Sequence, residues 1–210
     1  DYSLVFPYVE GWKDFEVPDK LQKLNHLPII ASRGCPFRCA FCAAHEQWGK
    51  IRRSLSPEEL VKRVKDLVSR YNIQYFRFYD ALFIGSEQKI LRFCELLQKA
   101  GLNISFRIDI RVGTRKEVLE RLRKVGCDVV GFGIESGSDR ILRRINKGIK
   151  REQIEETIRI CRELGYWMIG FFMISLPDET LADVQKTFEF FKYFDVINLQ
   201  FFKIHPNTAF

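Results

Sequence analysis

The sequence has no long uninterrupted run of apolar residues. No stretch approaches the roughly 18 to 20 residues that a membrane-spanning helix needs, and the first ten residues lack the basic and apolar regions of a signal peptide. Internal repeats, low-complexity segments and a linker within the chain are also missing. We therefore expect one principal domain without a membrane span, working in the cytoplasm.

The sequence also has no dominant charge block. It has 34 basic and 27 acidic residues, a formal net charge of +7, and this excess is spread along the chain. Such a balance favours anionic partners without identifying one. No basic stripe is interleaved with the aromatic residues that stack nucleic-acid bases, so the sequence does not support nucleic acid as a partner.

Apolar residues, by contrast, are plentiful. With 210 residues, 46% hydrophobic and 14% aromatic, the chain can build a large core. It begins with Asp1 rather than Met and stops at Phe210 just after an apolar run, so we expect a domain of a longer protein. Residues 1–26 have no clear period and are predicted to be an irregular lead-in or linker.

Short apolar strands alternate with amphipathic helices along the rest of the chain. The pattern predicts helices over 56–70 and 114–126, with capping boxes at Ser56/Glu59 and Thr114/Glu117. Alternation of this kind is typical of βαβ units in an α/β fold with a parallel sheet, either a barrel, a partial barrel or a doubly wound sheet. The six predicted strands are 27–32, 73–80, 103–110, 127–135, 166–174 and 195–205.

Three of the six cysteines, Cys35, Cys39 and Cys42, fall within eight residues of one predicted loop. A chain of this size in a reducing compartment has no need of disulfides. Three thiolates from one loop can hold a four-iron cluster that keeps one iron free for another ligand. With His45 as a fourth ligand, they can instead form a Cys3His zinc site. The remaining cysteines, Cys94, Cys127 and Cys161, are expected to be buried free thiols.

The segment CPFRCAFC resembles the radical SAM superfamily motif Cys-x3-Cys-x-aromatic-Cys, with Phe41 in the aromatic position. The segments GFGIESGSDRILRRINKG and GFFMISLPDET are similar to the subgroup that includes cobalamin-dependent enzymes and methylthiotransferases. The resemblance covers nearly the whole chain from Leu27. It implies a partial (β/α)6 TIM-like barrel over residues 27–210.

This resemblance also implies a chemistry. Cys35, Cys39 and Cys42 would hold a four-iron four-sulfur cluster, and S-adenosylmethionine would bind its open iron. One electron, from a donor such as flavodoxin or ferredoxin, would cleave the cofactor to a 5′-deoxyadenosyl radical that abstracts hydrogen from an unidentified substrate. The cobalamin-associated subgroup further implies cobalamin bound by a domain outside this chain, and methyl transfer in the full protein.

Three other functions stay open on the sequence. The first is a methylthiotransferase-like modification of transfer RNA. The second is a non-catalytic zinc-binding module built on the cysteine loop and His45. The third is a plain β/α enzyme in which the cysteines are incidental.

The sequence departs from the subgroup's patterns at a few positions. Asp80 is followed by Ala81 where the subgroup usually has a second aspartate. Ser175 and Asp178 stand where family members often have glycines, and Asn207 replaces the glycine of a Pro-Gly-Thr ending. The backbone path near the cofactor is therefore not predicted at these positions.

Active sites of β/α barrels lie at the carboxyl ends of the strands. The resemblance assigns Glu135, Ser136 and Arg107 to the ribose and methionine ends of the cofactor, Phe41 to the adenine and Asp80 to the same pocket. An internal Arg107–Glu135 ion pair, and a turn contact for Asp80, are the alternatives. Lys147, at a predicted helix end, is expected to have no function.

Overall fold

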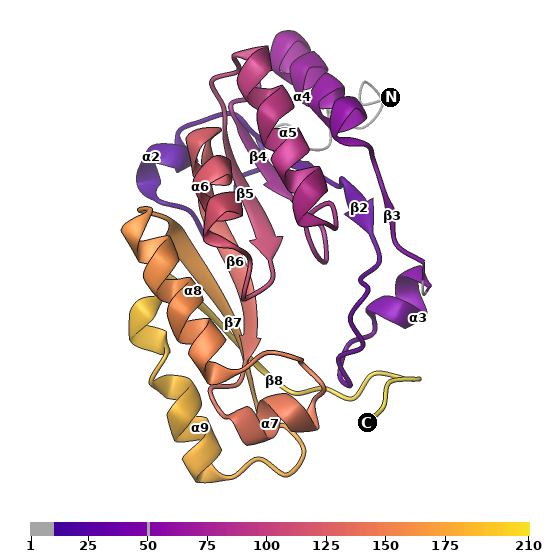
Figure 1. Cartoon of the computed structure of the whole chain (residues 1–210), viewed down its shortest axis with the longest axis vertical. Coiled ribbons are helices and arrows are strands. Elements are labelled where there is room, and N and C mark those ends of the chain that lie inside the picture. The colour runs from indigo at the N-terminus through magenta and orange to yellow at the C-terminus, as the bar shows by residue number, and fades with distance from the viewer. Residues whose placement is uncertain (1–10, 50) are drawn as a thin grey trace.

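The fold is organised around one parallel sheet of six strands. The structure, a computed structural model, describes residues 11–49 and 51–210. The sheet curls into a half-barrel (Figure 1), with β1 and β8 at its two open edges. The prediction of an α/β partial barrel is confirmed. In spatial order the strands are β1 (His26–Ile29), β4 (Tyr75–Phe78), β5 (Ser105–Ile110), β6 (Cys127–Glu135), β7 (Trp167–Ile174) and β8 (Val196–Phe201).

Helices cover the convex face of this sheet (Figure 1). The helices α4, α5, α6 and α8 each bury apolar side chains against the strands; in α4 these include Leu60, Val64 and Leu67. The Ser56 side chain accepts a hydrogen bond from the Glu59 backbone N–H at 3.1 Å, so the predicted cap is confirmed. The helices are α4 (Pro57–Tyr71), α5 (Glu87–Ala100), α6 (Lys116–Lys124), α7 (Asp139–Arg144), α8 (Arg151–Glu163) and α9 (Leu181–Phe188).

The predicted start of α6 is wrong. The Thr114 hydroxyl donates to the Arg111 carbonyl at 2.8 Å and closes a turn instead of capping the helix. The helix begins at Lys116, and its first residues find a partner on α5, because the Glu87 carboxylate accepts from the Arg115 backbone N–H at 3.0 Å. A tertiary contact has replaced the local cap.

Interlocking aromatic rings fill the core between the helices and the sheet. Phe78 on β4 meets Phe83 at 4.8 Å between ring centroids, and Phe93 of α5 lies 6.0 Å from Phe106 of β5, both edge to face. All four side chains are fully buried. The convex face is thereby packed, and the concave face is left to carry polar groups.

The described part of the lead-in packs against the concave face and includes a short helix, α2 (Asp19–Gln22). Asp14 is buried and accepts from the Tyr75 hydroxyl at 3.2 Å, and its carboxylate pairs with Arg107 of β5 at 3.2 Å. Glu16 pairs with the same guanidinium at 2.7 Å. The division into a lead-in (1–26) and a barrel (27–210) stays a prediction, and residues 14–16 contact the barrel through buried charges.

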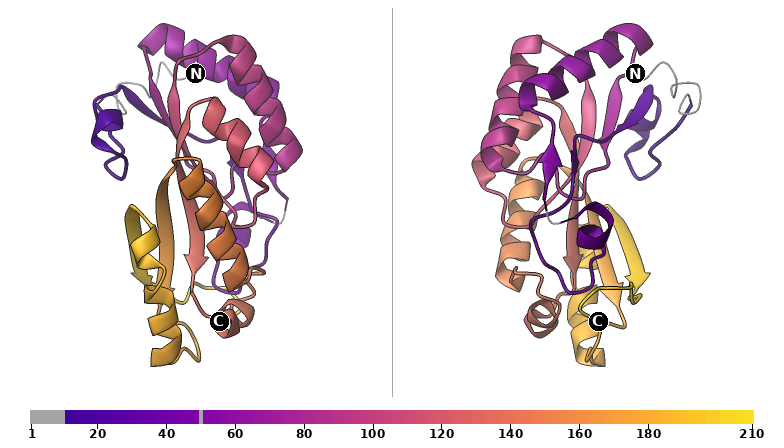
Figure 2. Two further views of the ribbon diagram at one scale, coloured as in Figure 1. Left: turned by 60° about the vertical axis from the view of Figure 1, so that its left-hand side comes forward. Right: turned by 90° about the vertical axis from the view of Figure 1, so that its right-hand side faces the viewer.

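The cysteine loop is held between two short strands that the sequence did not predict. β2 (Ser32–Arg33) pairs with β3 (Arg53–Ser54) in antiparallel fashion, and α3 (Ala44–Trp48) lies between them in the chain. We call residues 32–54 the cysteine arm. It extends along the open side of the half-barrel (Figure 2).

Distant segments anchor the cysteine arm. The Asn146 side chain donates to the Arg38 carbonyl at 2.7 Å, and the Ala40 backbone N–H donates to the Ile145 carbonyl at 2.8 Å. The Ala209 N–H donates to the Ala40 carbonyl at 3.1 Å. In the described part of the chain, no helix is both long and apolar enough to cross a membrane.

Candidate active site

A cavity of about 320 Å³ lies where the cysteine loop meets the carboxyl ends of the strands. It brings together six of the eight predicted site residues: the three loop cysteines, Phe41, Asp80 and Glu135. Its other walls come from the loop and from β4 to β7. They are formed by Phe37, Ala44, Ala81, Leu82, Asp109, Ile110, Arg111, Gly133, Lys147 and Phe171.

The three thiols lie at the mouth of this cavity. Cys35 and Cys39 are partly buried, and Cys42 is exposed. Burial raises the pKa of the Cys39 thiol, while the positive charges of Lys147 and Arg111 act in the opposite direction. Because only thiolates bind metal, these two cations favour the state that ligation requires.

The three thiols of the loop suit a four-iron cluster that keeps one iron open to another ligand. Among the residues that the structure describes, no three Cys, His, Asp or Glu side chains are placed to hold one metal ion. Thiolates around one zinc ion lie about 3.8 Å apart, as tetrahedral bonds of about 2.3 Å require. A four-iron cluster separates its ligands more widely. The side chain of His45, the fourth ligand of the zinc alternative, lies outside what the structure describes.

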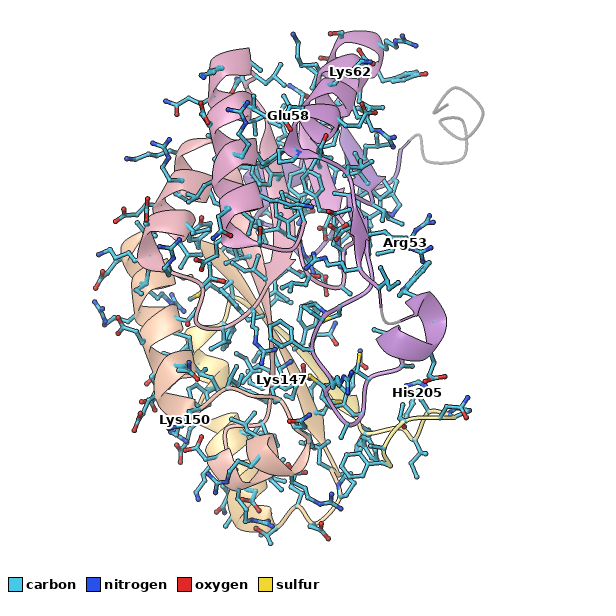
Figure 3. All side chains as sticks on the ribbon, turned by 45° about the vertical axis from the view of Figure 1, so that its right-hand side comes forward. Arg53, Glu58, Lys62, Lys147, Lys150 and His205 are labelled. Carbon is cyan, nitrogen blue, oxygen red and sulfur yellow. The ribbon has the colours of Figure 1, made fainter. Side chains whose placement is uncertain are left out.

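Glu135 and Lys147 form an ion pair in the wall of the cavity. The Lys147 ammonium donates to Glu135 Oε1 at 2.7 Å, and both residues are buried. Gly133 makes room for the pair, since a Cβ there would lie 2.5 Å from Glu135 Oε1 and 2.7 Å from Lys147 Nζ. Figure 3 shows Lys147 beside the cysteine loop. Lys147, for which the sequence predicted no function, therefore belongs to the site.

Arg107 and Ser136 do not line the cavity. The Arg107 guanidinium is fully buried in an internal ion pair, as the alternative expected, but its partners are Asp14 and Glu16. Glu135, the partner named in that alternative, pairs with Lys147 instead. The Ser136 hydroxyl is buried, accepts from the Ser138 backbone N–H at 3.2 Å and lies 3.3 Å from the Thr187 hydroxyl. The cofactor roles of Arg107 and Ser136 stay predictions.

Asp80 lines the cavity while holding two loops together. Its carboxylate accepts from the Ala31 N–H at 2.8 Å, the Ser32 hydroxyl at 2.7 Å and the Ile84 N–H at 3.4 Å. Burial raises the pKa of this carboxyl, and these hydrogen bonds lower it in part. The turn contact that the sequence offered as an alternative is present, and a cofactor role stays a prediction.

Arg111 and Asp109 were not assigned a role from the sequence, yet both line the cavity. The Arg111 guanidinium stacks on the Phe37 ring at 3.6 Å, and no carboxylate among the described residues pairs with it. Asp109 Oδ1 is buried without a hydrogen-bond partner in the described structure, and burial raises the pKa of its carboxyl. The signal was present: Arg107, Asp109 and Arg111 alternate with apolar residues, which places all three on one face of a strand.

Residues 29–191 match the family model described as the radical SAM superfamily. The chain belongs to this superfamily. An uncharacterized methyltransferase of Pyrococcus horikoshii is 36% identical over 174 residues, which make up 82% of this chain and 38% of that protein. This radical SAM chain therefore spans well under half the length of that relative.

Solved structures of radical SAM enzymes share the fold. The radical S-adenosylmethionine methyltransferase TsrM from Kitasatospora setae, with cobalamin and a [4Fe-4S] cluster bound, matches with a TM-score of 0.75 and 18% identity, over 89% of this chain and 36% of that one. The cobalamin-dependent S-adenosylmethionine radical enzyme OxsB, with aqua-cobalamin bound, matches with a TM-score of 0.71 and 25% identity. That match covers 87% of this chain and 28% of OxsB. Both neighbours are cobalamin-binding radical enzymes.

Proposed function

We propose that this chain is the catalytic core of a radical SAM methyltransferase in which Cys35, Cys39 and Cys42 hold a four-iron four-sulfur cluster. The observation that carries the proposal is the shared cavity: these thiols, the Glu135–Lys147 pair and Arg111 all line it. When bound, the cluster supplies the electron that cleaves S-adenosylmethionine reductively, giving a 5′-deoxyadenosyl radical that takes hydrogen from the substrate.

The charged side chains of the cavity suit the two ends of S-adenosylmethionine. The Arg111 guanidinium donates to the Lys147 backbone carbonyl and has no carboxylate partner among the described residues, so it can bind the methionine carboxylate, and the Lys147 ammonium adds a second positive charge. The Glu135 carboxylate can accept from the methionine ammonium or the ribose hydroxyls. Phe41, partly buried in an apolar cluster beside the loop, offers a face to the adenine.

The apolar walls of the cavity are suited to shield the 5′-deoxyadenosyl radical from water. Phe37, Phe171, Leu82 and Ile110 surround the space between the thiols and the sheet. A dry chamber of this kind limits quenching of a radical by water or stray hydrogen donors. The Asp109 carboxylate lies 3.8 Å from the Arg107 guanidinium and has one buried oxygen without a hydrogen-bond partner among the described residues, so it is a polar group in that space that can meet a donor on the substrate.

The full protein is proposed to transfer a methyl group with the help of cobalamin, held by a domain outside this chain. Support comes from the methyltransferase relative and from OxsB, whose structure contains aqua-cobalamin. We propose that the enzyme works in the cytoplasm, where a reducing environment keeps cysteines out of disulfide bonds, because its three loop cysteines are proposed to bind a cluster as thiolates. The substrate of methylation is not specified by these residues.

The deciding experiment measures 5′-deoxyadenosine formation. Protein is reconstituted anaerobically with iron and sulfide, reduced with dithionite and given S-adenosylmethionine, beside the Cys35→Ala/Cys39→Ala/Cys42→Ala variant. The proposal expects product from the wild type alone. A verified, reducible cluster that yields no product would refute the catalytic claim for this chain.

Metal analysis of the same preparations tests the zinc alternative. The proposal expects iron with acid-labile sulfide and a brown colour, and it expects His45→Ala to keep its iron. Colourless protein that contains zinc and loses it on His45→Ala substitution would support the Cys3His module instead.

A further inference from the structure

Positive charge is concentrated in the cysteine arm. Between Ser32 and Ser54 the sequence has five basic residues and one acidic residue, Glu46, so +4 of the chain's formal net charge of +7 lies in this segment. The rest of the chain is nearly balanced. The excess charge therefore surrounds the loop that carries the three cysteines.

The arginines on the outside of the cysteine arm have no acidic partners. Arg33 and Arg53 lie directly opposite each other in the β2–β3 pair, and Arg38 lies in the loop between them; all three are exposed. None forms an ion pair with a described residue, whereas most arginines of the outer helices do. Like charges placed directly across an antiparallel pair are destabilising. The arm therefore maintains an unfavourable arrangement that an anionic partner would relieve.

These arginines face away from the cavity. Arg33, Arg38 and Arg53 are not among the residues that line it, in contrast to Arg111 and Lys147. In Figure 3, Arg53 lies on the outer side of β3, away from the body of the sheet. Their charge is thus available to a partner outside the molecule, while the cavity has its own cations.

The same surface carries exposed apolar side chains. Ile51, next to the arginines of β3, is 76% exposed, and Ile30, just before β2, is 45% exposed. An apolar centre with a basic rim is the usual composition of a protein-binding patch. Nucleic acid is disfavoured, because the patch has no row of exposed aromatic rings on which bases stack.

We propose that the outer face of the cysteine arm, formed by Arg33, Arg38, Ile51 and Arg53, docks an acidic electron-carrier protein of the flavodoxin or ferredoxin class. The inference rests on the proposed function, which requires an electron at the cluster. β2 and β3 directly bound the cysteine loop, and Cys42 is exposed, so a carrier on this face sits against the loop. The carrier loses one electron, the cluster gains it, and no covalent bond forms.

Transient electron-transfer contacts are small, below about 1,200 Å² of total buried surface, and depend on complementary charge. The cysteine arm matches both properties. Binding should accordingly weaken as salt screens the arginines.

The first test measures the direct binding of oxidised flavodoxin. Calorimetry or flavin fluorescence monitors the titration at low and high salt. The wild type is compared with Arg33→Glu/Arg53→Glu and with the control Lys65→Glu/Lys186→Glu, which changes the net charge equally at exposed helix positions. We expect the arm variant to bind at least about tenfold more weakly than both others at low salt. Equal affinity of the arm variant and the control would overturn the proposal. This titration needs no turnover, so it can fail independently of the proposed function.

The second test compares electron sources. 5′-Deoxyadenosine formation driven by reduced flavodoxin should fall about tenfold in the arm variant, while formation driven by dithionite stays within about twofold of the wild type. If both rates fell in equal proportion, the arm would affect the reaction in the cavity and not the docking of the electron carrier.

A single substitution controls for the possibility that the double variant loses binding because it misfolds. Arg53→Glu places a carboxylate opposite Arg33, which stabilises the β2–β3 pair while removing part of the basic surface. We expect flavodoxin binding to weaken and thermal stability to hold or rise. Transfer RNA is titrated beside flavodoxin. If Arg53→Glu kept flavodoxin binding and lost transfer RNA binding, the arm would be a nucleic-acid surface and the proposal would be refuted.

Discussion

The buried Glu135–Lys147 pair is the most sensitive single contact of the cavity. Both residues are buried, and the absence of a side chain at Gly133 makes room for the pair. Removing one partner leaves the other charge buried alone, which costs far more than the pair contributes.

We predict that Lys147→Met lowers the free energy of unfolding by about 3 kcal/mol and weakens S-adenosylmethionine binding. Denaturant titration and equilibrium dialysis of the reconstituted protein measure the two effects. The double variant Glu135→Gln/Lys147→Met should recover part of the stability, because no unpaired charge remains. Strictly additive effects of the two substitutions would contradict a coupled pair.

Left-handed backbone at non-glycine residues is a second feature of single residues. Ser175, Asp178 and Asn207 have φ values of 64°, 66° and 63°. At these three positions the sequence departs from the glycines of the family patterns that it resembles, and the backbone adopts a conformation that strains a residue with a side chain.

Ser175→Gly is therefore expected to raise the free energy of unfolding by about 0.5 to 1 kcal/mol. Ser69→Gly, the same change at an exposed position inside α4, should lower it by about 0.5 kcal/mol. Thermal melts of both variants beside the wild type decide the matter. If Ser175→Gly lowered the stability as Ser69→Gly does, φ at Ser175 would not be strained.

At the scale of secondary structure, a network at the start of α9 fixes this helix to α7. Asp183 accepts from the Ser138 hydroxyl at 2.6 Å and from Thr180, and it pairs with Arg140. Burial acts to raise the pKa of Asp183, and these hydrogen bonds outweigh it and hold the pKa below the ordinary value. The network thus joins the loops after β6 and β7.

Asp183→Asn should lower the free energy of unfolding by about 2 kcal/mol at neutral pH. A carboxyl whose folded pKa is depressed stabilises the fold above its unfolded pKa and loses that contribution as pH falls toward the folded value. The gap between wild type and variant should accordingly shrink below about pH 4. A gap that is constant between pH 7 and pH 3 would argue against this ionised network.

The strands and helices were predictable because burial imposes a period on the sequence. β6 spans the predicted residues 127–135, and α4 (Pro57–Tyr71) lies within one residue of the predicted bounds 56–70. β8 ends at Phe201, short of the predicted residue 205, because the chain then turns toward the cysteine arm. The β2–β3 pair was missed, since two-residue strands have no period.

The site was predictable only where a motif names its residues. The three cysteines, Phe41, Asp80 and Glu135 meet at the cavity. The place of Lys147 at the cavity was not predicted, because its partner Glu135 lies twelve residues earlier and only folding brings the two together. The resemblance assigned Arg107 to the cofactor, and its place outside the cavity was not foreseen because the lead-in carboxylates that pair with it cannot be recognised locally.

At the scale of the whole molecule, the lead-in and the barrel share buried charge. Arg107 is fully buried and takes its partners from residues 14 and 16. A chain cut at the predicted boundary of residue 27 would leave this guanidinium without those carboxylates.

We predict that Asp14→Ala costs about 3 kcal/mol of folding stability, and that a chain starting at Leu27 is less stable than one starting at Gly11. Asp19→Ala, on the exposed side of α2, is the control and should change stability by less than about 0.5 kcal/mol. Urea titrations of these proteins give the comparison. Equal stability of the two truncated chains would place the boundary at residue 27.

The anchors of the cysteine arm also set the order of events during synthesis. Arg38 is held by Asn146, 108 residues later, and Ala40 by Ala209, close to the end of the chain. At roughly 5 to 20 residues per second, the ribosome needs on the order of ten to thirty seconds to supply the last of these partners. Until then the three thiols lie on an unanchored loop. We therefore predict that iron–sulfur assembly on the cysteine loop follows the synthesis of these anchoring residues, and that nascent chains stalled before Asn146 leave the ribosome free of iron.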